Sequence, residues 1–137
     1  MTKQTIETKL VDFYVPKFKK VQIPKSEYDA IYELFNSVGK GPKEFYTPDN
    51  KGRIRIQDNR IIYLKAGQIG LKSILESIGN LKNLKELYLF DNQLNSVPES
   101  FGNLENLKIL NLGHNQLNEK SIEFLKELKE KGVKVIY

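Results

Sequence analysis

The chain of 137 residues is long enough for one domain with a modest hydrophobic core. Its 39% hydrophobic and 28% charged residues are typical of a globular protein and exclude a membrane-embedded chain, and its net charge of +5 makes it mildly basic. The absence of cysteine excludes disulfides and thiolate-bound metal, and together with an N-terminus that lacks an apolar leader segment it favours a cytoplasmic location.

The first forty residues predict a β-hairpin followed by a helix. Apolar and polar residues alternate in 10–15 and again in 20–23, as they do in two paired strands. Ser26 is expected to cap a helix that ends near Gly39. Apolar residues recur at helical spacing along one stripe of this helix: Ile31, Leu34, Phe35 and Val38.

The next segment predicts a loop and a second hairpin. Residues 40–52 are rich in Gly and Pro and are expected to form the loop. Residues 53–64 contain two β-type runs on either side of Asp58 and Asn59, a pair typical of a tight hairpin turn. The second run is expected to be the first strand of a repeating unit. We therefore predict that residues 1–60 cover this unit as an N-terminal capping region.

A basic stretch in the first hairpin suggests an alternative function. Residues 1–60 hold 12 Lys+Arg and 8 Asp+Glu, so most of the positive balance lies there. The stretch would suit an anion-binding module for nucleic acid or an acidic membrane. Its lysines are equally explained as the water-facing side chains of a hairpin, and we favour that interpretation. The basic residues concerned are Lys17, Lys19, Lys20 and Lys25.

Two segments that lie 23 residues apart share one pattern, LYLFDNQL at 87–94 and LNLGHNQL at 110–117. A fixed period in this range is typical of proteins in which each repeat forms one coil of a solenoid. Leu87 and Leu89 alternate with polar and aromatic residues, so they are expected on the inner side of a short strand. Each coil then places its strand beside the next, which predicts a parallel sheet with one strand per repeat.

Asparagine and glycine recur at the turns of this pattern. Asn92 and Asn115 stand where the chain leaves each strand. A carboxamide offers two donors and an acceptor, so both are predicted to satisfy backbone groups of the turn. Gly79 and Gly102 lie near the ends of the segments between strands, where a left-handed residue is expected.

These residues resemble the leucine-rich repeat family, whose pattern is LxxLxLxxNxL. The resemblance covers residues 61–137, with two complete copies and two degenerate copies at the ends. It implies an α/β fold: a short leucine-rich-repeat solenoid with one parallel strand per repeat, capped by the N-terminal hairpin-plus-helix region and by a C-terminal helix and strand. It also implies that the asparagines are buried and that the concave sheet surface holds protein partners, which in similar proteins include small GTPases.

The C-terminal segment predicts a longer helix and a final strand. Ser121 is expected to cap this helix and Gly132 to end it. Residues 133–137 form the last strand, with Val133 and Val135 in the places of the strand leucines. This strand is predicted to be the open edge of the sheet.

Residues that face away from the leucine core form the candidate partner-binding surface. Adjacent exposed aromatic residues often anchor interfaces, although they also pack simply as cross-strand neighbours. Four strands make a strip of only ~200–250 Å², against ~800 Å² per partner in a standard interface. The candidate residues are Tyr63, Lys65, Glu86, Tyr88, Phe90, Asp91, Ile109, Asn111 and His114.

The sequence offers little catalytic chemistry. His114 is the one histidine, and Asp91 is the acid expected beside it one repeat earlier. No nucleophile accompanies them, and no glycine-rich phosphate loop is present. We therefore predict a non-enzymatic module without metal or cofactor, which binds a protein and serves as a regulator or scaffold in intracellular signalling.

Overall fold

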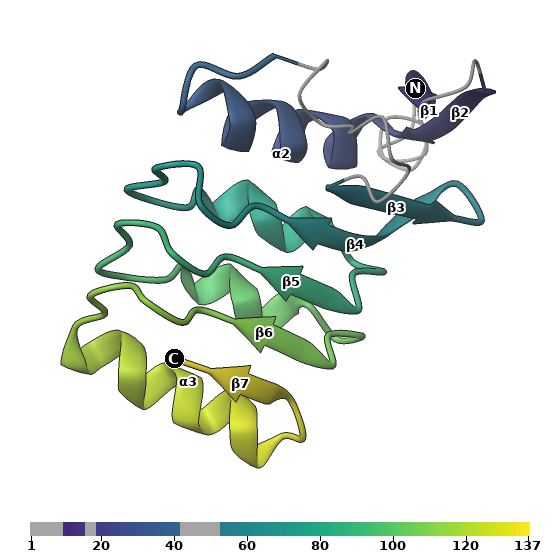
Figure 1. The fold of residues 1–137 in the computed structure, drawn as a ribbon. Coiled ribbons are helices and arrows are strands. Elements are labelled where there is room, and N and C mark those ends of the chain that lie inside the picture. The colour runs from purple at the N-terminus through teal and green to yellow at the C-terminus, as the bar shows by residue number, and fades with distance from the viewer. Residues whose placement is uncertain (1–9, 16–18, 42–52) are drawn as a thin grey trace.

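The computed structural model describes residues 10–15, 19–41 and 53–137, with side chains from residue 22 onward in these ranges. The predicted loop therefore lies largely outside the described residues, as do Lys17 and the side chains of Lys19 and Lys20. The elements in chain order are β1 (Leu10–Val15), β2 (Lys19–Pro24), α2 (Lys25–Asn36), β3 (Ile54–Gln57), β4 (Arg60–Lys65), the 3₁₀ helix η2 (Glu76–Asn80), β5 (Glu86–Tyr88), the 3₁₀ helix η3 (Glu99–Asn103), β6 (Ile109–Asn111), α3 (Glu119–Glu130) and β7 (Lys134–Ile136) (Figure 1).

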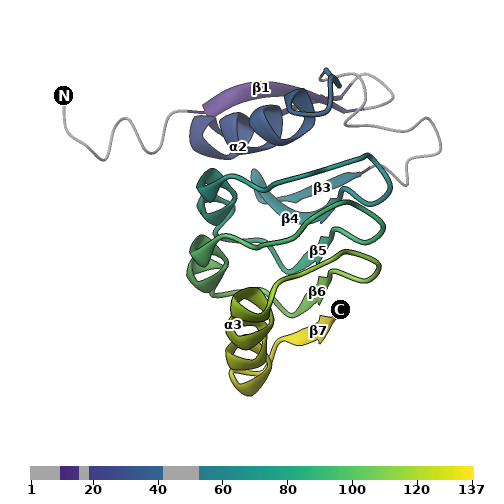
Figure 2. The same cartoon turned by 90° about the vertical axis from the view of Figure 1, so that its left-hand side faces the viewer.

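Five strands form one sheet in the order β3-β4-β5-β6-β7. The strands β4 to β7 are parallel, and each belongs to a successive coil, as the 23-residue period predicts. Figure 2 shows the sheet along one side of the stack, with η2, η3 and α3 along the other. This mixed α/β arrangement confirms the predicted fold class and is consistent with a solenoid.

The leucines of the repeat fill the space between the sheet and the helical side. Leu87, Leu89, Leu110 and Leu112 are almost completely shielded from solvent, because alternate residues of each short strand point inward. The 3₁₀ helices contribute Ile78 and Phe101 to the same hydrophobic core.

The predicted hairpin at the first coil is present. Asp58 and Asn59 both have a left-handed backbone, with φ of 52° and 61°, which matches the twist of two antiparallel strands joined by a two-residue turn. Arg55 pairs with Tyr63, and the pairing then shifts by one residue. The side chain of Arg55 consequently lies on the same side of the sheet as that of Tyr63.

The last coil departs from the predicted register. Val135 pairs with Leu110, and Lys134 pairs with Ile109, so this coil spans 25 residues (134 − 109) instead of 23. The two additional residues accommodate α3, which replaces the short 3₁₀ helix of the other coils. The prediction that Val133 also occupies a strand-leucine place is therefore wrong. The strand β7 is an edge of the sheet, as predicted.

The helix α2 and the strand β2 pack against the first coil (Figure 2). Ile31 and Phe35 of α2 are fully buried. Glu27 is also fully buried, and its carboxylate accepts hydrogen bonds from the side chain of Arg60 and from Ile61 N at 2.9 Å. The division of the chain at residue 60 stays a prediction. The sheet contains strands from both sides of this boundary, because β3 pairs with β4.

Two predicted helix caps are wrong. The helix α2 begins one residue before Ser26, with Pro24 at its N-cap position. At α3 the cap is Asn118, whose side chain accepts from Ser121 N at 2.8 Å. Ser121 lies inside the first turn and is buried, and its hydroxyl accepts from Val97 N at 3.1 Å. Ser121 thus joins α3 to the preceding coil instead of capping the helix.

Gly79 and Gly102 also differ from expectation, because neither has a positive φ. A Cβ atom on Gly79 would lie 2.7 Å from Ser100 Cβ of the next coil, so glycine allows η2 and η3 to approach closely. A Cβ atom on Gly102 would meet no heavy atom nearer than Phe124 Cζ at 3.9 Å.

Candidate functional site

The candidate residues lie on β4, β5 and β6 and in the turns that follow these strands. These three strands pair in the register that the 23-residue period predicts, since Tyr63 pairs with Glu86 and Glu86 with Ile109. We call the outward side of the strands β3 to β7 the sheet face. Lys65, Asp91 and His114 are exposed there, whereas the remaining candidates are partly buried: Tyr63, Glu86, Tyr88, Phe90, Ile109 and Asn111. Their role in binding stays a prediction.

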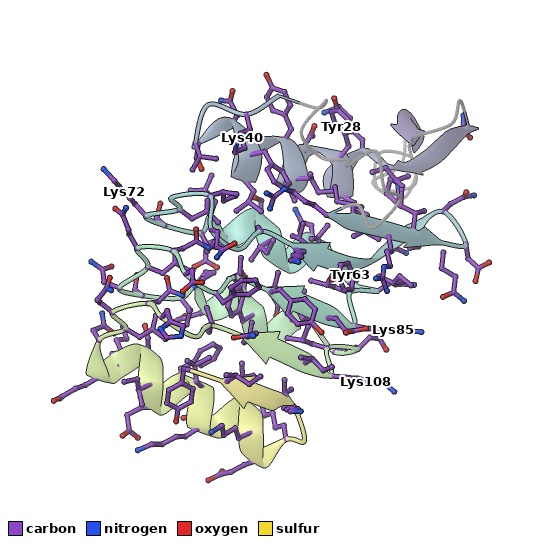
Figure 3. All side chains as sticks on the ribbon, viewed as in Figure 1. Tyr28, Lys40, Tyr63, Lys72, Lys85 and Lys108 are labelled. Carbon is purple, nitrogen blue, oxygen red and sulfur yellow. The ribbon has the colours of Figure 1, made fainter. Side chains whose placement is uncertain are left out.

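Aromatic side chains contact one another across the middle of the sheet face. The ring centroids of Tyr63 and Tyr88 lie 5.4 Å apart with the planes tilted by 45°, within the range of a favourable aromatic pair. The guanidinium of Arg55 lies over the Tyr63 ring at 4.2 Å from its centroid, a cation–π geometry. Figure 3 labels Tyr63 near the centre of the stack of strands. The sequence does not mark Arg55 as a candidate, because this residue falls in the predicted capping region.

Phe90 extends the aromatic group beyond the end of its strand. A Cβ atom on Gly67 would lie 2.8 Å from Phe90 Cζ, so the Phe90 ring rests directly on the Gly67 backbone. Lys65 Nζ lies over the Phe90 ring at 5.9 Å from its centroid. We call Tyr63, Tyr88 and Phe90 the aromatic strip.

The polar group of Tyr88 is satisfied within its own strand. Tyr88 Oη donates to Glu86 Oε1 at 2.6 Å. This hydrogen bond, helped by partial burial, raises the pKa of Tyr88 to about 12, because the carboxylate stabilises the protonated phenol. Tyr88 is therefore neutral at physiological pH, and Glu86 is held beside it.

The turn after each strand contains a residue with left-handed backbone. Gln68, Asp91 and His114 have φ of 59°, 53° and 55°, a conformation that is uncommon for residues other than glycine. Gln68 Nε2 donates to Asp91 Oδ2 at 3.2 Å. His114 and Asp91 occupy corresponding places in neighbouring coils, as predicted. The sequence gives only a weak signal for the positive φ: aspartate and histidine are enriched in this conformation, whereas glutamine is not.

Asn92 has the structural role predicted for it. Its Oδ1 accepts from Ile69 N at 3.2 Å and from Leu71 N at 3.0 Å, and its Nδ2 donates to Ala66 O at 2.9 Å. These groups belong to the turn of the preceding coil, so Asn92 connects two coils. Asn115 makes the equivalent bond to Leu94 N at 2.9 Å and is partly exposed.

Comparison with known proteins agrees with this geometry. A family model described as "Leucine Rich repeats (2 copies)" matches residues 82–127. A solved structure of the LRR protein LIC12759 of Leptospira interrogans resembles 56% of this chain, with a TM-score of 0.52 and 30% sequence identity. The chain therefore contains leucine-rich repeats. The matched part is 19% of the length of the Leptospira protein, and a search of curated proteins found no significant match.

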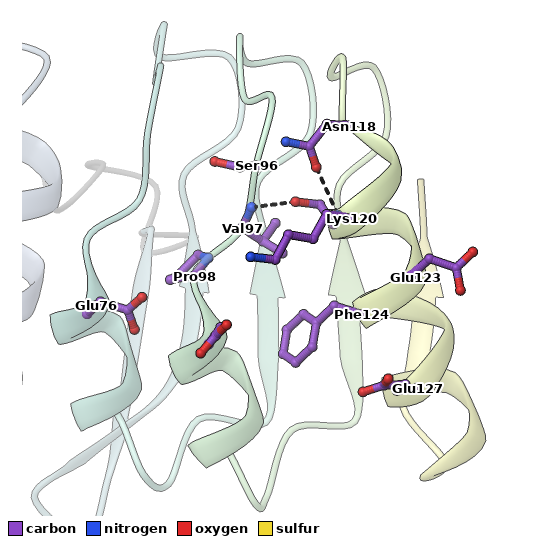
Figure 4. A pocket seen from close by; sticks show the side chains of 11 residues that line it. Glu76, Ser96, Val97, Pro98, Asn118, Lys120, Glu123, Phe124 and Glu127 are labelled. Atoms are coloured by element: carbon purple, nitrogen blue, oxygen red, sulfur yellow. Dashed lines mark hydrogen bonds between the residues drawn. The ribbon is translucent and has the colours of Figure 1, made fainter.

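The protein also has a hollow of about 820 Å³ on the side opposite the sheet, between the 3₁₀ helices and α3 (Figure 4). One wall of the hollow is α3, the longer helix that the C-terminal segment predicts. Carboxylates and one amine line it around an apolar floor that includes Phe124. The charged lining residues are Glu76, Glu99, Glu123, Glu127 and Lys120.

Within the described ranges of the chain, no three His, Cys, Asp or Glu side chains are grouped so that they could hold a metal ion. The helices of the same ranges include none with the length and apolar character to span a membrane.

Proposed function

We propose that this protein is an interaction module that holds a protein partner on its sheet face. Leucine-rich repeat domains generally mediate protein–protein interaction. The observation that carries the proposal is the aromatic strip, which lies in the middle of the sheet face and has cationic groups beside it. Partly shielded aromatic side chains surrounded by polar groups are the places where binding energy is usually concentrated.

The size of the sheet face favours a partner that also contacts the surrounding turns. Four parallel strands span only ~19 Å at ~4.8 Å each, so the strands alone bury less than a standard interface. The exposed turn residues Gln68, Asp91 and His114 continue the sheet face on one side. We include in the proposal a non-enzymatic role as a regulator or scaffold in intracellular signalling. This role rests on the family resemblance alone, and so does the proposal of a small GTPase as the partner. The cytoplasmic location rests on the absence of cysteine.

The alternative, an anion-binding module that uses the basic first hairpin, gains no support from the described residues of that hairpin. Of the basic residues in the first hairpin and the start of α2, only Lys25 has a described side chain, and its Nζ lies 2.6 Å from Asp29 Oδ2. A lysine already paired with a carboxylate is a weaker ligand for a phosphate.

The experiment is affinity capture of the physiological partner with the full chain. Tyr88→Ala combined with Phe90→Ala should abolish capture, since truncation of a central aromatic anchor costs about 2 kcal/mol or more. Tyr32→Ala with Leu75→Ala is the matched control, because it removes a similar apolar area, 43% and 53% exposed, away from the sheet face. Lys19→Glu with Lys20→Glu tests the first hairpin. Capture that survives the first double variant and fails in the last would move the site to the hairpin.

A further inference from the structure

Positive charge is concentrated at the β3–β4 end of the sheet face. Arg55 and Lys65 are exposed and flank the aromatic strip, and Arg53 is partly exposed beside them. Arg53 Nη1 lies 3.4 Å from Lys65 O, so its guanidinium is positioned over the end of β4. Lys134 adds a fourth cation at the opposite edge, on β7.

The carboxylates of the sheet face hydrogen-bond neutral side chains instead of these cations. Glu86 accepts the hydroxyl of Tyr88, and Asp91 accepts the side-chain amide of Gln68. Neither Arg55 nor Lys65 forms an ion pair with any residue that the structure describes. Their ammonium and guanidinium groups are therefore available to a ligand, while the adjacent rings hold them in place.

The geometry of these cations suits carboxylates. The guanidinium of Arg55 lies over the Tyr63 ring, which leaves its N–H groups at the rim free to donate to a planar anion. Arg55 and Lys65 stand on adjacent antiparallel strands, two positions apart along β4, because Arg55 pairs with Tyr63. Acidic side chains at alternate positions of an extended segment, ~7 Å apart, match this spacing.

A nucleic acid fits the same cations less well. Single-stranded nucleic acids bind by stacking bases on free aromatic faces. In the sheet face the Phe90 ring rests on Gly67 and has Lys65 Nζ 5.9 Å from its centroid, and the Tyr63 ring has the guanidinium of Arg55 over it. Aromatic edges that remain accessible favour apolar side chains of a peptide over bases.

We infer that the sheet face binds an extended acidic segment of its protein partner, with carboxylates held by Arg55 and Lys65 and apolar side chains on Tyr88 and Phe90. This inference rests on the proposed function and names the chemistry of the partner. It predicts that binding weakens with salt but persists through its apolar contacts.

The probe is a peptide of about ten alternating Glu and Leu residues, long enough to cross the sheet. It is added to the ¹⁵N-labelled full chain and compared with a Lys–Leu peptide and a thymidine oligonucleotide of similar length. The Glu–Leu peptide should shift amide signals of β3, β4 and β5. Arg55→Glu with Lys65→Glu should weaken its binding by about tenfold or more. Arg55→Gln with Lys65→Gln should weaken it less, and all variants should melt near wild type because both residues are exposed.

The matched control is Lys72→Glu with Lys108→Glu, which makes the same change in net charge at exposed lysines outside the sheet face (Figure 3). An equal loss in this control would show general charge attraction and overturn the inference. Stronger shifts with the oligonucleotide, or no shifts with the Glu–Leu peptide, would also overturn it.

The partner-capture experiment distinguishes the two proposals. Capture lost in the Tyr88 and Phe90 double variant but kept in the Arg55 and Lys65 double variant would leave the proposed function standing and refute the acidic segment. Capture kept in both would refute the proposed function itself.

Discussion

Asn92 and Asn115 share one acceptor, since the side-chain nitrogen of each lies 3.0 Å from Leu89 O. Asn92 reaches this carbonyl from its own coil, and Asn115 reaches it from the next coil. The two carboxamides thus form a continuous hydrogen-bonded ladder through the interior, in which each asparagine completes the turn of the coil before it.

This ladder predicts that Asn92 and Asn115 contribute unequally to the free energy of unfolding. Asn92→Ala should destabilise the protein by about 1–3 kcal/mol, because it removes the acceptor of the buried Leu71 N–H and of the partly buried Ile69 N–H. Asn115→Ala should cost less, because Asn115 accepts from one turn N–H and is partly exposed. Urea denaturation measures both, with Asn106→Ala as the control at an exposed hydrogen bond. An Asn92→Ala variant as stable as the control would contradict the buried role.

The close approach of the 3₁₀ helices predicts a difference between two glycines at the same repeat position. Gly79→Ala should destabilise by about 1–3 kcal/mol, because its Cβ would collide with Ser100. Gly102→Ala should leave stability nearly unchanged, because the site is open. Thermal unfolding of the two variants compares them directly, and equal melting temperatures would refute the steric argument. Ser100→Gly added to Gly79→Ala should recover part of the loss.

The left-handed backbone of the turn residues predicts that glycine can replace them without loss of stability. His114→Gly should be as stable as wild type or more so, because glycine adopts φ of 55° without strain. His114→Val should cost about 1–2 kcal/mol, because a β-branched side chain is least compatible with this conformation. Gln116→Val, at an exposed residue of the same coil without positive φ, is the control. Similar unfolding free energies for all three would argue against backbone strain.

The hydrogen bond between Tyr88 and Glu86 predicts a tyrosine that titrates late. The pKa of Tyr88 in the folded protein, about 12, lies above its ordinary value of 10.0, so folding favours the protonated phenol. The stabilisation is complete below pH 10 and is lost as pH rises from 10 to 12. NMR of ¹³C-labelled tyrosine should resolve this titration. Glu86→Gln should lower the pKa of Tyr88, whereas Glu105→Gln should not change it. A Tyr88 titration that ignores Glu86→Gln would show that another group causes the shift.

The sequence predicted those parts of the fold that repeat. Leu87 and Leu110 recur in one pattern because every coil needs an inward-facing apolar side chain at that position. Asn92 is recognisable because few side chains can hydrogen-bond the backbone groups of a buried turn. The ends were harder to predict. Val135 occupies the strand position beside Leu110 that was predicted for Val133, since the length of α3 is set by packing and not by the period. Ser121 was mistaken for a cap because a buried serine and a capping serine look alike in sequence.

On the sheet face, too, only the features that follow from the repeat could be predicted from the sequence. The pairing of Tyr63 with Glu86 followed from the period alone. The cation–π contact of Arg55 did not, because it depends on the antiparallel strand β3, which lies outside the repeat. The contact of Phe90 with Gly67 also depends on the backbone of the turns, which a pattern of leucines does not describe.

Glu27 gives the repeat array a boundary that differs chemically from its interior. Between coils the connecting group is a neutral carboxamide, whereas between α2 and the first coil it is a buried carboxylate that needs Arg60 opposite it. A further 23-residue unit inserted between β5 and β6 would bring its own leucines and asparagine and should be accepted. The same unit placed directly after α2 would bury Glu27 without a counterion. Further coils can therefore be added in the middle of the array, whereas the coil that contacts α2 must supply a cation opposite Glu27.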